Sequence, residues 1–507
     1  MRNAPSRSSA RALVLLCASL AAGAWALVAL AMSPRYSPAN ALSFVLLFCS
    51  LLFPVLTCVL RPAAGRGAGV GEIGGLDICQ PGVVVALFYY FYMVIPALHI
   101  WHDLGLHSTW IDPTWPPERL FNVTCALGLL GLVAFGAGYH AGLGRPPGRA
   151  IGMLFPRGAV AWSSAAWGVV AAMIAVGLVF KLYHLAAFGG LSPSVLLYLS
   201  PSYAIESGVK IGGVPTLLES LFDWGVLLLL FRSVTTGRYR VVALALTGLA
   251  LLLAYLLSGK RSAIVPFLLF PAVWYHYLRR RIGVGRGLVY LAGGLVLTVL
   301  LLLMRSVGPL LVTAGGATFT GRAVDILVQP VRFFLYSPEL TVYDMTMLAV
   351  QDRAFFLHSV GGPFWGGLQH NVAPLTYVIP RFLWPTKPAF ADFGTLFYER
   401  AIGDRPEIGF SVGLVGGAYV FAGVIGVALA MALVGVVSRW VYDVLRPRMD
   451  GPWQVFLYSI FLWMAFLLVR FGTLGSTVMF FFQYELVGVL AALVIALWLG
   501  PRHPSMK

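Results

Sequence analysis

Apolar residues occur in long runs along almost the whole chain. A run of about 20 apolar residues crosses the hydrocarbon core of a bilayer as an α-helix. On that criterion the sequence predicts about twelve membrane spans. They lie at residues 12–32, 40–60, 81–101, 121–142, 159–180, 216–231, 241–258, 262–278, 287–304, 411–437, 452–469 and 476–499. This pattern is typical of an all-α polytopic membrane protein.

The composition agrees with this class of fold. Of the 507 residues, 59% are hydrophobic and only 11% are charged, which is more apolar surface than a soluble protein can bury. The first apolar run follows Arg2, Arg7 and Arg11 and is longer than the apolar region of a signal peptide. We therefore expect it to be retained as the first helix.

The formal net charge of +16 is explained by topology. With the amino terminus placed in the cytoplasm, the inner loops and both termini hold about twenty basic residues and about four acidic ones. The rest of the chain is close to electrically balanced. The basic excess therefore follows the positive-inside rule, with both termini cytoplasmic, and does not indicate a nucleic-acid partner.

The longest stretch without a span falls on the outer face. It divides the chain into a first membrane part (1–304), a large external loop (305–410) and a second membrane part (411–507). Apolar and charged residues recur at helical spacing within residues 331–359. We expect one or two amphipathic helices there, lying on the outer surface.

Several cations lie on the outer face, where the positive-inside rule disfavours them. Lys260 and Arg261 form the turn of the hairpin between the seventh and eighth spans, and Arg470 follows the eleventh. The external loop places Arg381 and Lys387 among prolines and aromatic residues. Binding of an anion at the outer leaflet would explain this placement. For three other loop cations a salt bridge with the loop's own acids is the simpler interpretation: Arg353, Arg400 and Arg405.

Motifs of soluble nucleotide- or metal-dependent enzymes are absent from the sequence. It has no P-loop, no HExxH, no GxSxG and no Asp-x-Asp of the kind that holds the metal in nucleotide-sugar transferases. The nine histidines are scattered, and the five cysteines lack metal-ligand spacing. We expect neither a metal nor a cofactor, and interpret the cysteines as small apolar side chains.

Acidic residues within the predicted spans cost about 2.5–3.5 kcal/mol each on insertion scales. Glu219 and Asp223 are four residues apart, and therefore share one face of the sixth span near its outer end. They either complement the helix dipole there or serve a function. Glu485 lies deeper, in the last span. We expect it to pair with an arginine such as Arg470, and the alternative is a catalytic base.

Three sequence features resemble one known family. The external loop contains the run Pro380-Arg381-Phe382-Leu383-Trp384-Pro385-Thr386-Lys387-Pro388. A glycine-rich span follows at residues 413–426, and the turn Ser258-Gly259-Lys260-Arg261-Ser262 joins two earlier spans. Together with the number and orientation of the spans, these features resemble the Wzy-type oligosaccharide repeat-unit polymerases, the O-antigen and exopolysaccharide polymerases of bacterial inner membranes.

The resemblance implies a GT-C-like fold and a metal-independent glycosyl transfer facing the periplasm. Its substrates would be undecaprenyl-diphosphate-linked oligosaccharides in the bilayer. A flippase and a chain-length regulator of the same pathway would be further partners. Arginine suits a diphosphate leaving group, because its guanidinium binds two phosphate oxygens and stays charged. A carboxylate would deprotonate the acceptor hydroxyl.

Candidate residues follow from this chemistry. The expected catalytic residues are Arg261, Arg381, Asp325 and Asp344, with Glu339 and Asp392 as alternative bases. The residues expected to bind the diphosphate or the sugar are Lys260, Arg305, Arg322, Arg332, Lys387, Trp384, His370 and Arg470.

Two other functions are compatible with the sequence. An O-antigen ligase, or another transferase of lipid-linked sugars, shares the architecture and the anion chemistry. A polysaccharide transporter or flippase would instead show internal repeats and charges near the middle of the membrane. We find no clear repeat, and most charges lie near the outer rim.

Overall fold

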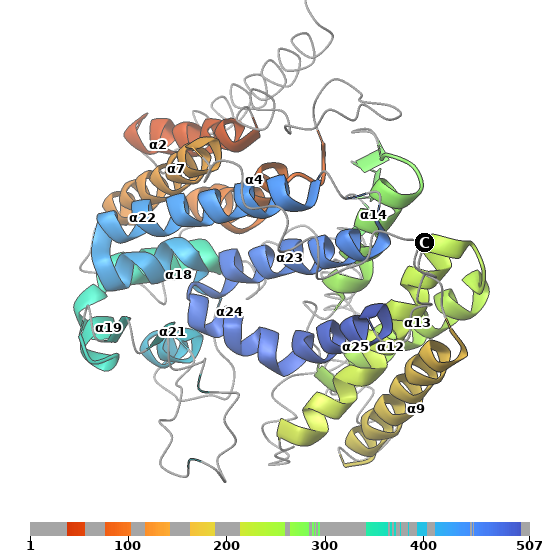
Figure 1. Cartoon of the computed structure of the whole chain (residues 1–507). Coiled ribbons are helices and arrows are strands. Elements are labelled where there is room, and N and C mark those ends of the chain that lie inside the picture. Colours follow the sequence, from red (N-terminus) through yellow and green to blue (C-terminus); the bar gives the residue numbers. More distant parts are fainter. Residues whose placement is uncertain are drawn as a thin grey trace, which may run out of the picture. The chain divides into compact units, whose positions relative to one another are not determined.

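The structure is a computed structural model in which every regular element of the described residues is a helix (Figure 1). It describes residues 38–55, 77–102, 117–141, 163–187, 213–258, 264–282, 341–362, 393–402, 411–446 and 451–497. It also describes residues 286, 287, 289, 290, 293, 294, 366, 367, 370, 371, 376, 384 and 449. Within these residues the predicted all-helical class is confirmed.

Helices occupy the predicted spans wherever the chain is described. They are α2 (Pro38–Ser50), α4 (Pro81–Tyr89), the π-helical turn η1 (Tyr90–Val94), α5 (Ile95–His102), α7 (Pro117–Ala141), α9 (Ser164–Ala187), α12 (Gly213–Thr236), α13 (Arg240–Ser258) and α14 (Val265–Leu278). The second membrane part contains α22 (Gly413–Leu445), α23 (Pro452–Phe471), α24 (Leu474–Phe480), the π-helical turn η7 (Phe481–Glu485) and α25 (Leu486–Leu497). The predicted span at 12–32 and most of the one at 287–304 lie outside the described residues.

Five stretches of helix are long and apolar enough to cross a membrane, among the residues described. They are Pro81–Leu98, Glu118–Ala141, Ser164–Ala187, Gly413–Leu445 and Pro452–Phe471. Shorter apolar helices accompany them, including Arg240–Ala254 and Val265–Leu278. These lengths fit a membrane-embedded protein, while the number of twelve spans stays a prediction.

The chain forms two compact units. The first comprises Met1–Pro146, Leu335–Arg446 and Met464–Met479, and the second comprises Pro147–Phe334, Pro447–Trp463 and Phe480–Lys507. Each unit therefore gathers segments that are far apart in the sequence.

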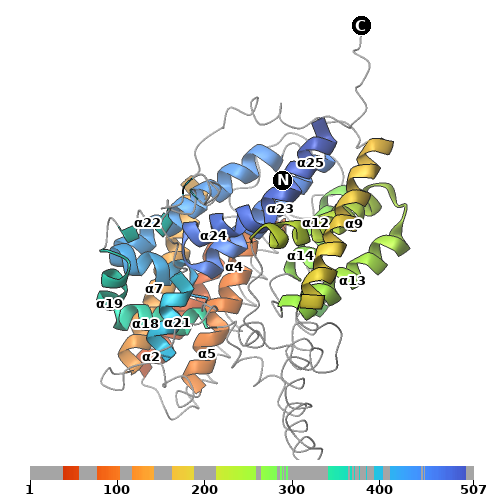
Figure 2. The same ribbon diagram turned by 90° about the horizontal axis from the view of Figure 1, so that it is seen from below.

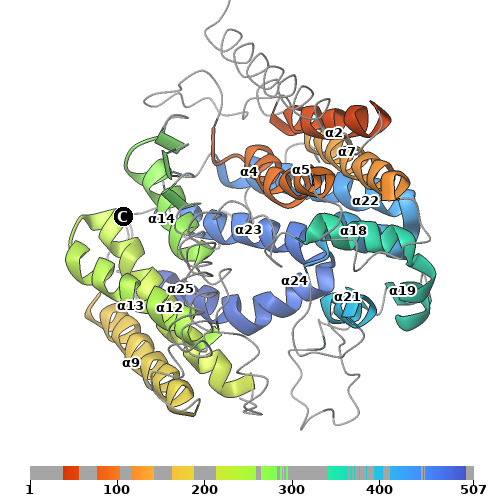
Figure 3. The same cartoon turned by 180° about the vertical axis from the view of Figure 1, so that it is seen from behind.

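Glycines bring α7 and α22 together in the first unit (Figure 3). A Cβ at Gly138 of α7 would collide with the carbonyl of Ala432, and a Cβ at Gly435 of α22 would collide with the carbonyl of Phe135. Small residues of this kind allow the backbones of apolar helices to approach closely. The two collisions mirror each other, so both glycines define one helix–helix contact.

The helix α18 (Val342–Gln351) differs from the predicted surface helix. It packs against α7 and α22, and its residues from Val342 to Ala349 are all buried. The hydroxyl of Tyr343 donates to the carbonyl of Phe121 at 2.9 Å and lies 3.1 Å from the thiol of Cys125. The expectation of an outer-surface helix is therefore wrong for α18, because its charged and polar positions face protein.

The predicted external loop has two more described helices, which form a small core with α18 and α22. They are α19 (Arg353–Ser359) and α21 (Phe393–Ile402). Phe356 of α19 stacks on Phe397 of α21, with ring centroids 3.9 Å apart. Phe393 stacks on Phe421 of α22. Half of α19 stays exposed, including Phe355, as an amphipathic helix requires.

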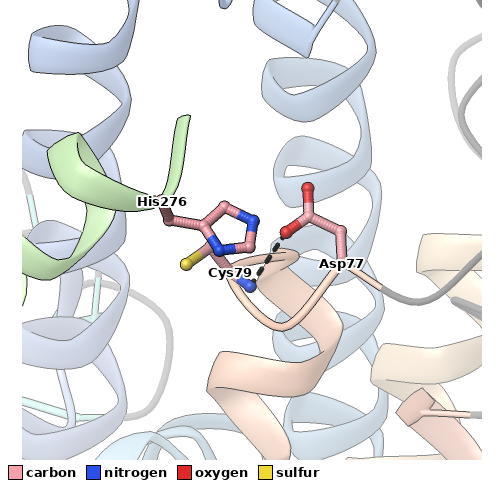
Figure 4. A group of neighbouring side chains, drawn as sticks. All are labelled: Asp77, Cys79 and His276. Atoms are coloured by element: carbon pink, nitrogen blue, oxygen red, sulfur yellow. Dashed lines mark hydrogen bonds between the residues drawn. The ribbon is translucent and has the colours of Figure 1, made fainter. Parts of the chain in front are cut away.

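A tight turn begins α4 (Figure 4). A carboxylate oxygen of Asp77 accepts the backbone N–H of Cys79 at 3.0 Å, and its other oxygen accepts the hydroxyl of Tyr442 at 3.0 Å. Arg446 lies 3.8 Å from the same carboxylate. Burial, and then the charge of Asp77, raise the pKa of the Cys79 thiol well above its usual range. Cys79 therefore stays a neutral, small buried side chain.

The second unit packs α9 against α12 through another glycine contact (Figures 1 and 2). A Cβ at Gly177 of α9 would collide with the backbone of Phe222. Aromatic residues of α12, α14 and the first part of α23 fill the core of this unit. Trp274 stacks on Phe456, with ring centroids 5.8 Å apart, and its indole N–H donates to Ser459 at 3.0 Å.

Candidate functional site

Four of the predicted site residues lie in the described part of the chain, and all four belong to the first unit. They are Asp344, His370, Trp384 and Arg470. The remaining predicted residues lie outside the described residues: Lys260, Arg261, Arg305, Arg322, Asp325, Arg332, Arg381 and Lys387. The same holds for the alternative bases Glu339 and Asp392.

Arg470 is the described residue that best fits binding of an anion. It lies in the last turn of the apolar helix α23 and is only 9% exposed. Its Nε donates to the hydroxyl of Ser411 at 3.1 Å. Ser411 comes directly before Val412, the N-cap residue of α22. We call Arg470, Ser411 and the amino end of α22 the Arg470 cluster.

The amino end of α22 adds a second source of positive potential to the Arg470 cluster. The first N–H groups of a helix lack partners within the helix and carry the positive end of its dipole. Val412 has no side-chain oxygen that could cap them. A cation fixed beside such a helix end is an arrangement that suits phosphate or carboxylate groups.

Glycines hold this region tightly together. Gly413 opens α22 with a φ of +74°, a conformation that favours glycine, and a Cβ there would collide with Val342 of α18. A Cβ at Gly417 would collide with the carbonyl of Gly472, just after α23. The glycine-rich span that carried part of the family resemblance thus has a packing role in these two positions.

The amino end of α24 is capped by nearby side chains. The hydroxyl of Thr473 accepts the backbone N–H of Ser476 at 3.0 Å. The side-chain oxygen of Asn371 accepts the N–H of Gly475 at 3.3 Å, while its amide donates to the carbonyl of Gly367 at 2.8 Å. Asn371 therefore links Gly367 to the turn that follows Arg470.

The other three described candidates have different surroundings. Asp344 is 4% exposed within the buried helix α18. The ring of His370 packs against Phe393 and Phe421 at centroid distances of 5.8 and 6.1 Å. Trp384 is 37% exposed, as expected of an interfacial or sugar-contacting side chain.

Three further loop arginines were predicted to form salt bridges, and one of them, Arg405, lies outside the described residues. Arg400 forms the predicted salt bridge, since its guanidinium lies 2.8 Å from Asp352. Arg353 does not follow that prediction: its Nε donates to the carbonyls of Tyr419 and Val420, at 3.1 and 3.0 Å. These carbonyls precede a break in α22, where Ala422 and Gly423 leave the helical conformation.

The second unit contains an ion pair and a histidine–glutamate hydrogen bond that sequence reasoning missed. Lys181 of α9 lies 3.0 Å from Asp223 of α12, and His184 lies 2.6 Å from Glu219. Lys181 was expected in an outer loop, but α9 continues to Ala187 and the side chain is 4% exposed. Helical spacing was the available signal, because residues 181 and 184 share one helix face as residues 219 and 223 do.

Glu485 also lies in the second unit, at the end of the π-helical turn η7. It is 4% exposed, and one of its oxygens accepts the indole N–H of Trp463 at 2.7 Å. The predicted arginine partner is therefore replaced by a tryptophan. Single π-helical turns often occur at functional sites, so Glu485 stays a candidate for function.

Comparison with known proteins gives no match: no family model fits the chain, and neither a curated protein nor a solved structure is significantly similar to it.

Proposed function

We propose that the chain is a glycosyltransferase that polymerises undecaprenyl-diphosphate-linked oligosaccharide repeat units at the outer face of a bacterial inner membrane. The proposal rests on the loop and hairpin motifs of the sequence, and on one structural observation. That observation is the Arg470 cluster, a buried arginine beside the amino end of an apolar helix.

The proposed reaction requires charge stabilisation at one place. The bond between the donor sugar and its diphosphate breaks, and the acceptor hydroxyl oxygen forms the new glycosidic bond. The diphosphate leaves with the electron pair, on its lipid, and the hydroxyl proton passes to a carboxylate. Groups that neutralise the developing charge on the diphosphate lower the barrier most.

In this proposal Arg470 and the amino end of α22 bind the diphosphate. Arg261 and Arg381, to which the sequence assigns the same chemistry, lie outside the described residues. Arg470 is suitable because it is fixed by Ser411 and shielded from water, where its charge acts more strongly. The base would be one of the carboxylates that the sequence offers: Asp325, Asp344, Glu339 or Asp392.

Substitution of Arg470 tests the proposal. Arg470→Gln is expected to lower chain extension by about 10²–10³-fold, the usual loss when one charge-stabilising donor is removed. Arg470→Lys keeps the charge but loses the planar guanidinium that binds two oxygens at once, so it should retain part of the activity. The measurement is the length distribution of the lipid-linked glycan, with protein amount and thermal stability determined in the same membranes.

Arg400→Gln is the matched control. It removes an arginine of the predicted external loop that already pairs with Asp352, so polymer length should stay unchanged. Ser411→Ala removes the hydrogen bond to Arg470 but keeps the arginine itself. It should shorten the polymer moderately. Wild-type polymer length in a stably folded Arg470→Gln variant would remove Arg470 from the site.

The product distinguishes polymerase from ligase. A polymerase gives a longer glycan that is carried on the lipid diphosphate of the acceptor. A ligase gives glycan attached to lipid A or to protein. Mass analysis of the glycan carrier therefore decides between these two transferases.

Transport of a polysaccharide intermediate is the second candidate, favoured by the Lys181–Asp223 ion pair between α9 and α12. Charges buried within membrane helices often mark transport pathways. If the chain moves a lipid-linked unit, Lys181→Met combined with Asp223→Leu should block the appearance of single units on the outer face. If the chain is a polymerase, single units should still appear on the outer face of cells with the same substitutions. At most, the joining of these units should be lost.

A further inference from the structure

The second unit contains a pocket that the proposed transfer reaction does not use. Its volume is about 860 Å³, within the range of ligand pockets in proteins. Residues of α12, α13 and α14 form its walls, together with Val289, Tyr290, Gly293 and Gly294. All of these residues belong to one unit, so the pocket is complete within it.

Arginines form one end of this pocket. Arg240, Arg279 and Arg280 line it, and none of the described residues that line it is acidic. Arg240 and Arg279 converge, because their Nη2 atoms lie 3.4 and 3.5 Å from the point that a Cβ of Gly237 would occupy. Two like charges held so close attract an anion.

Arg279 has a structural role as well. Its side chain donates to the carbonyls of Val234 and Thr235, in the last turn of α12. A cation there complements the helix dipole. Arg240 has the opposite placement, since it is the first residue of α13, where a cation opposes the helix dipole and an anion is favoured. A negatively charged ligand is therefore favoured at the amino end of α13.

Most of the remaining lining residues are apolar, and several of them are exposed. Leu244 is 65% exposed, Val289 70% and Tyr290 59%, although all three are large hydrophobic side chains. Such a surface suits hydrocarbon rather than water. A ligand that fits the whole pocket therefore combines an anionic group with long apolar chains.

We infer that this pocket binds an anionic phospholipid. Its phosphate would contact Arg240, Arg280 and the amino end of α13, and its acyl chains would lie along Leu244, Leu268 and Tyr290. The arginines are those that the charge pattern assigns to the cytoplasmic side, where anionic lipids attract basic residues. The inference does not depend on the transfer reaction proposed above.

Lipid binding to the whole detergent-solubilised protein tests this inference. Native mass spectrometry, after addition of phosphatidylglycerol or phosphatidylethanolamine, measures how much of each lipid is retained. We expect preferential retention of phosphatidylglycerol, and about tenfold weaker binding in the double variant Arg240→Gln/Arg280→Gln. Arg279 is left intact because it caps α12.

Arg238→Gln is the matched control. Arg238 is an exposed cation two residues before Arg240, and it does not line the pocket. Its removal should leave lipid retention unchanged. Equal losses of lipid retention in the control and in the double variant would mean that only net charge matters, and would contradict the proposed site. Leu244→Ser, which alters only the apolar wall, should weaken binding without changing any charge.

Inorganic phosphate distinguishes a lipid site from a plain phosphate site. If millimolar phosphate protects the protein against thermal unfolding as well as phosphatidylglycerol does, the apolar walls contribute nothing and the lipid assignment fails. Equal retention of the zwitterionic lipid would overturn it too. Protection by phosphatidylglycerol alone, lost in the double variant, supports the inference.

Discussion

At the scale of single residues, the pairing of Lys181 with Asp223 shows how a charge can be kept inside an apolar helix. Burial of each charged side chain costs free energy, and the attraction to its partner offsets that cost. Breaking the pair therefore costs more free energy than the intact pair adds to the stability of the protein.

This reasoning predicts an asymmetric double-mutant cycle. Lys181→Met leaves Asp223 without its cation and should destabilise the protein by about 3 kcal/mol, near the low end for a broken buried pair, since Asp223 is 29% exposed. Lys181→Met combined with Asp223→Leu should recover most of that loss. The measurement is thermal unfolding in detergent.

The exposed pair of Arg400 and Asp352 provides the comparison for this cycle. Its arginine is 38% exposed, so Arg400→Gln should cost no more than about 1 kcal/mol. A loss at Arg400 as large as the loss at Lys181 would contradict the distinction between buried and exposed pairs.

At the scale of elements, helix contacts in both units depend on specific glycines. Gly435→Ala should separate α22 from α7 and lower the unfolding temperature, because the new Cβ collides with backbone that cannot rotate away. Gly248→Ala in α13 should do the opposite, since nothing lies within 4 Å of its Cβ position and alanine favours helix by about 1 kcal/mol. Similar effects of both substitutions would exclude close packing as the reason.

The break in α22 gives a second prediction at this scale. Gly423 has a φ of +62°, where alanine is strained by about 1–2 kcal/mol, and Arg353 binds the carbonyls that precede the break. Arg353→Met and Gly423→Ala should each lower the unfolding temperature. Their combined effect should be smaller than the sum, because both act on one feature. Strict additivity would mean that Arg353 does not stabilise the break.

The helices were predictable from the lengths of apolar runs, but their ends were not. The predicted fifth span stopped at residue 180 because Lys181 is charged, whereas α9 continues to Ala187 after Asp223 neutralises that charge. The burial of α18 was missed for a related reason. The mixture of apolar and charged residues within 331–359 predicted a helix with an aqueous face, whereas the hydroxyl of Tyr343 meets a partner more than two hundred residues away.

The candidate site was predictable only in part. Arg470 was selected because a cation at the outer end of a span is unusual, and its role in the site stays a prediction. Ser411 was not selected, since nothing in its local sequence indicates that α23 ends beside it. Pairing between distant segments is set by packing, which the pattern of a single sequence does not encode.

At the scale of the whole molecule, the orientation in the membrane is open to direct test. In a background without native cysteines, Trp384→Cys should react from outside intact cells with a reagent that cannot cross the membrane, since Trp384 is exposed and belongs to the predicted outer segment. Arg280→Cys should react only after lysis, because it is exposed on the predicted inner side. The reverse pattern would invert the topology.

The burial of α18 has a consequence for recombination between related genes. A segment that looks like an exchangeable outer loop carries a helix whose tyrosine hydroxyl must meet the carbonyl of Phe121 and the thiol of Cys125. A chimera that exchanges residues 305–410 alone would place a foreign helix between native α7 and α22. Viable hybrids are therefore expected to inherit these three helices from one parent, even though more than two hundred residues separate the first from the second.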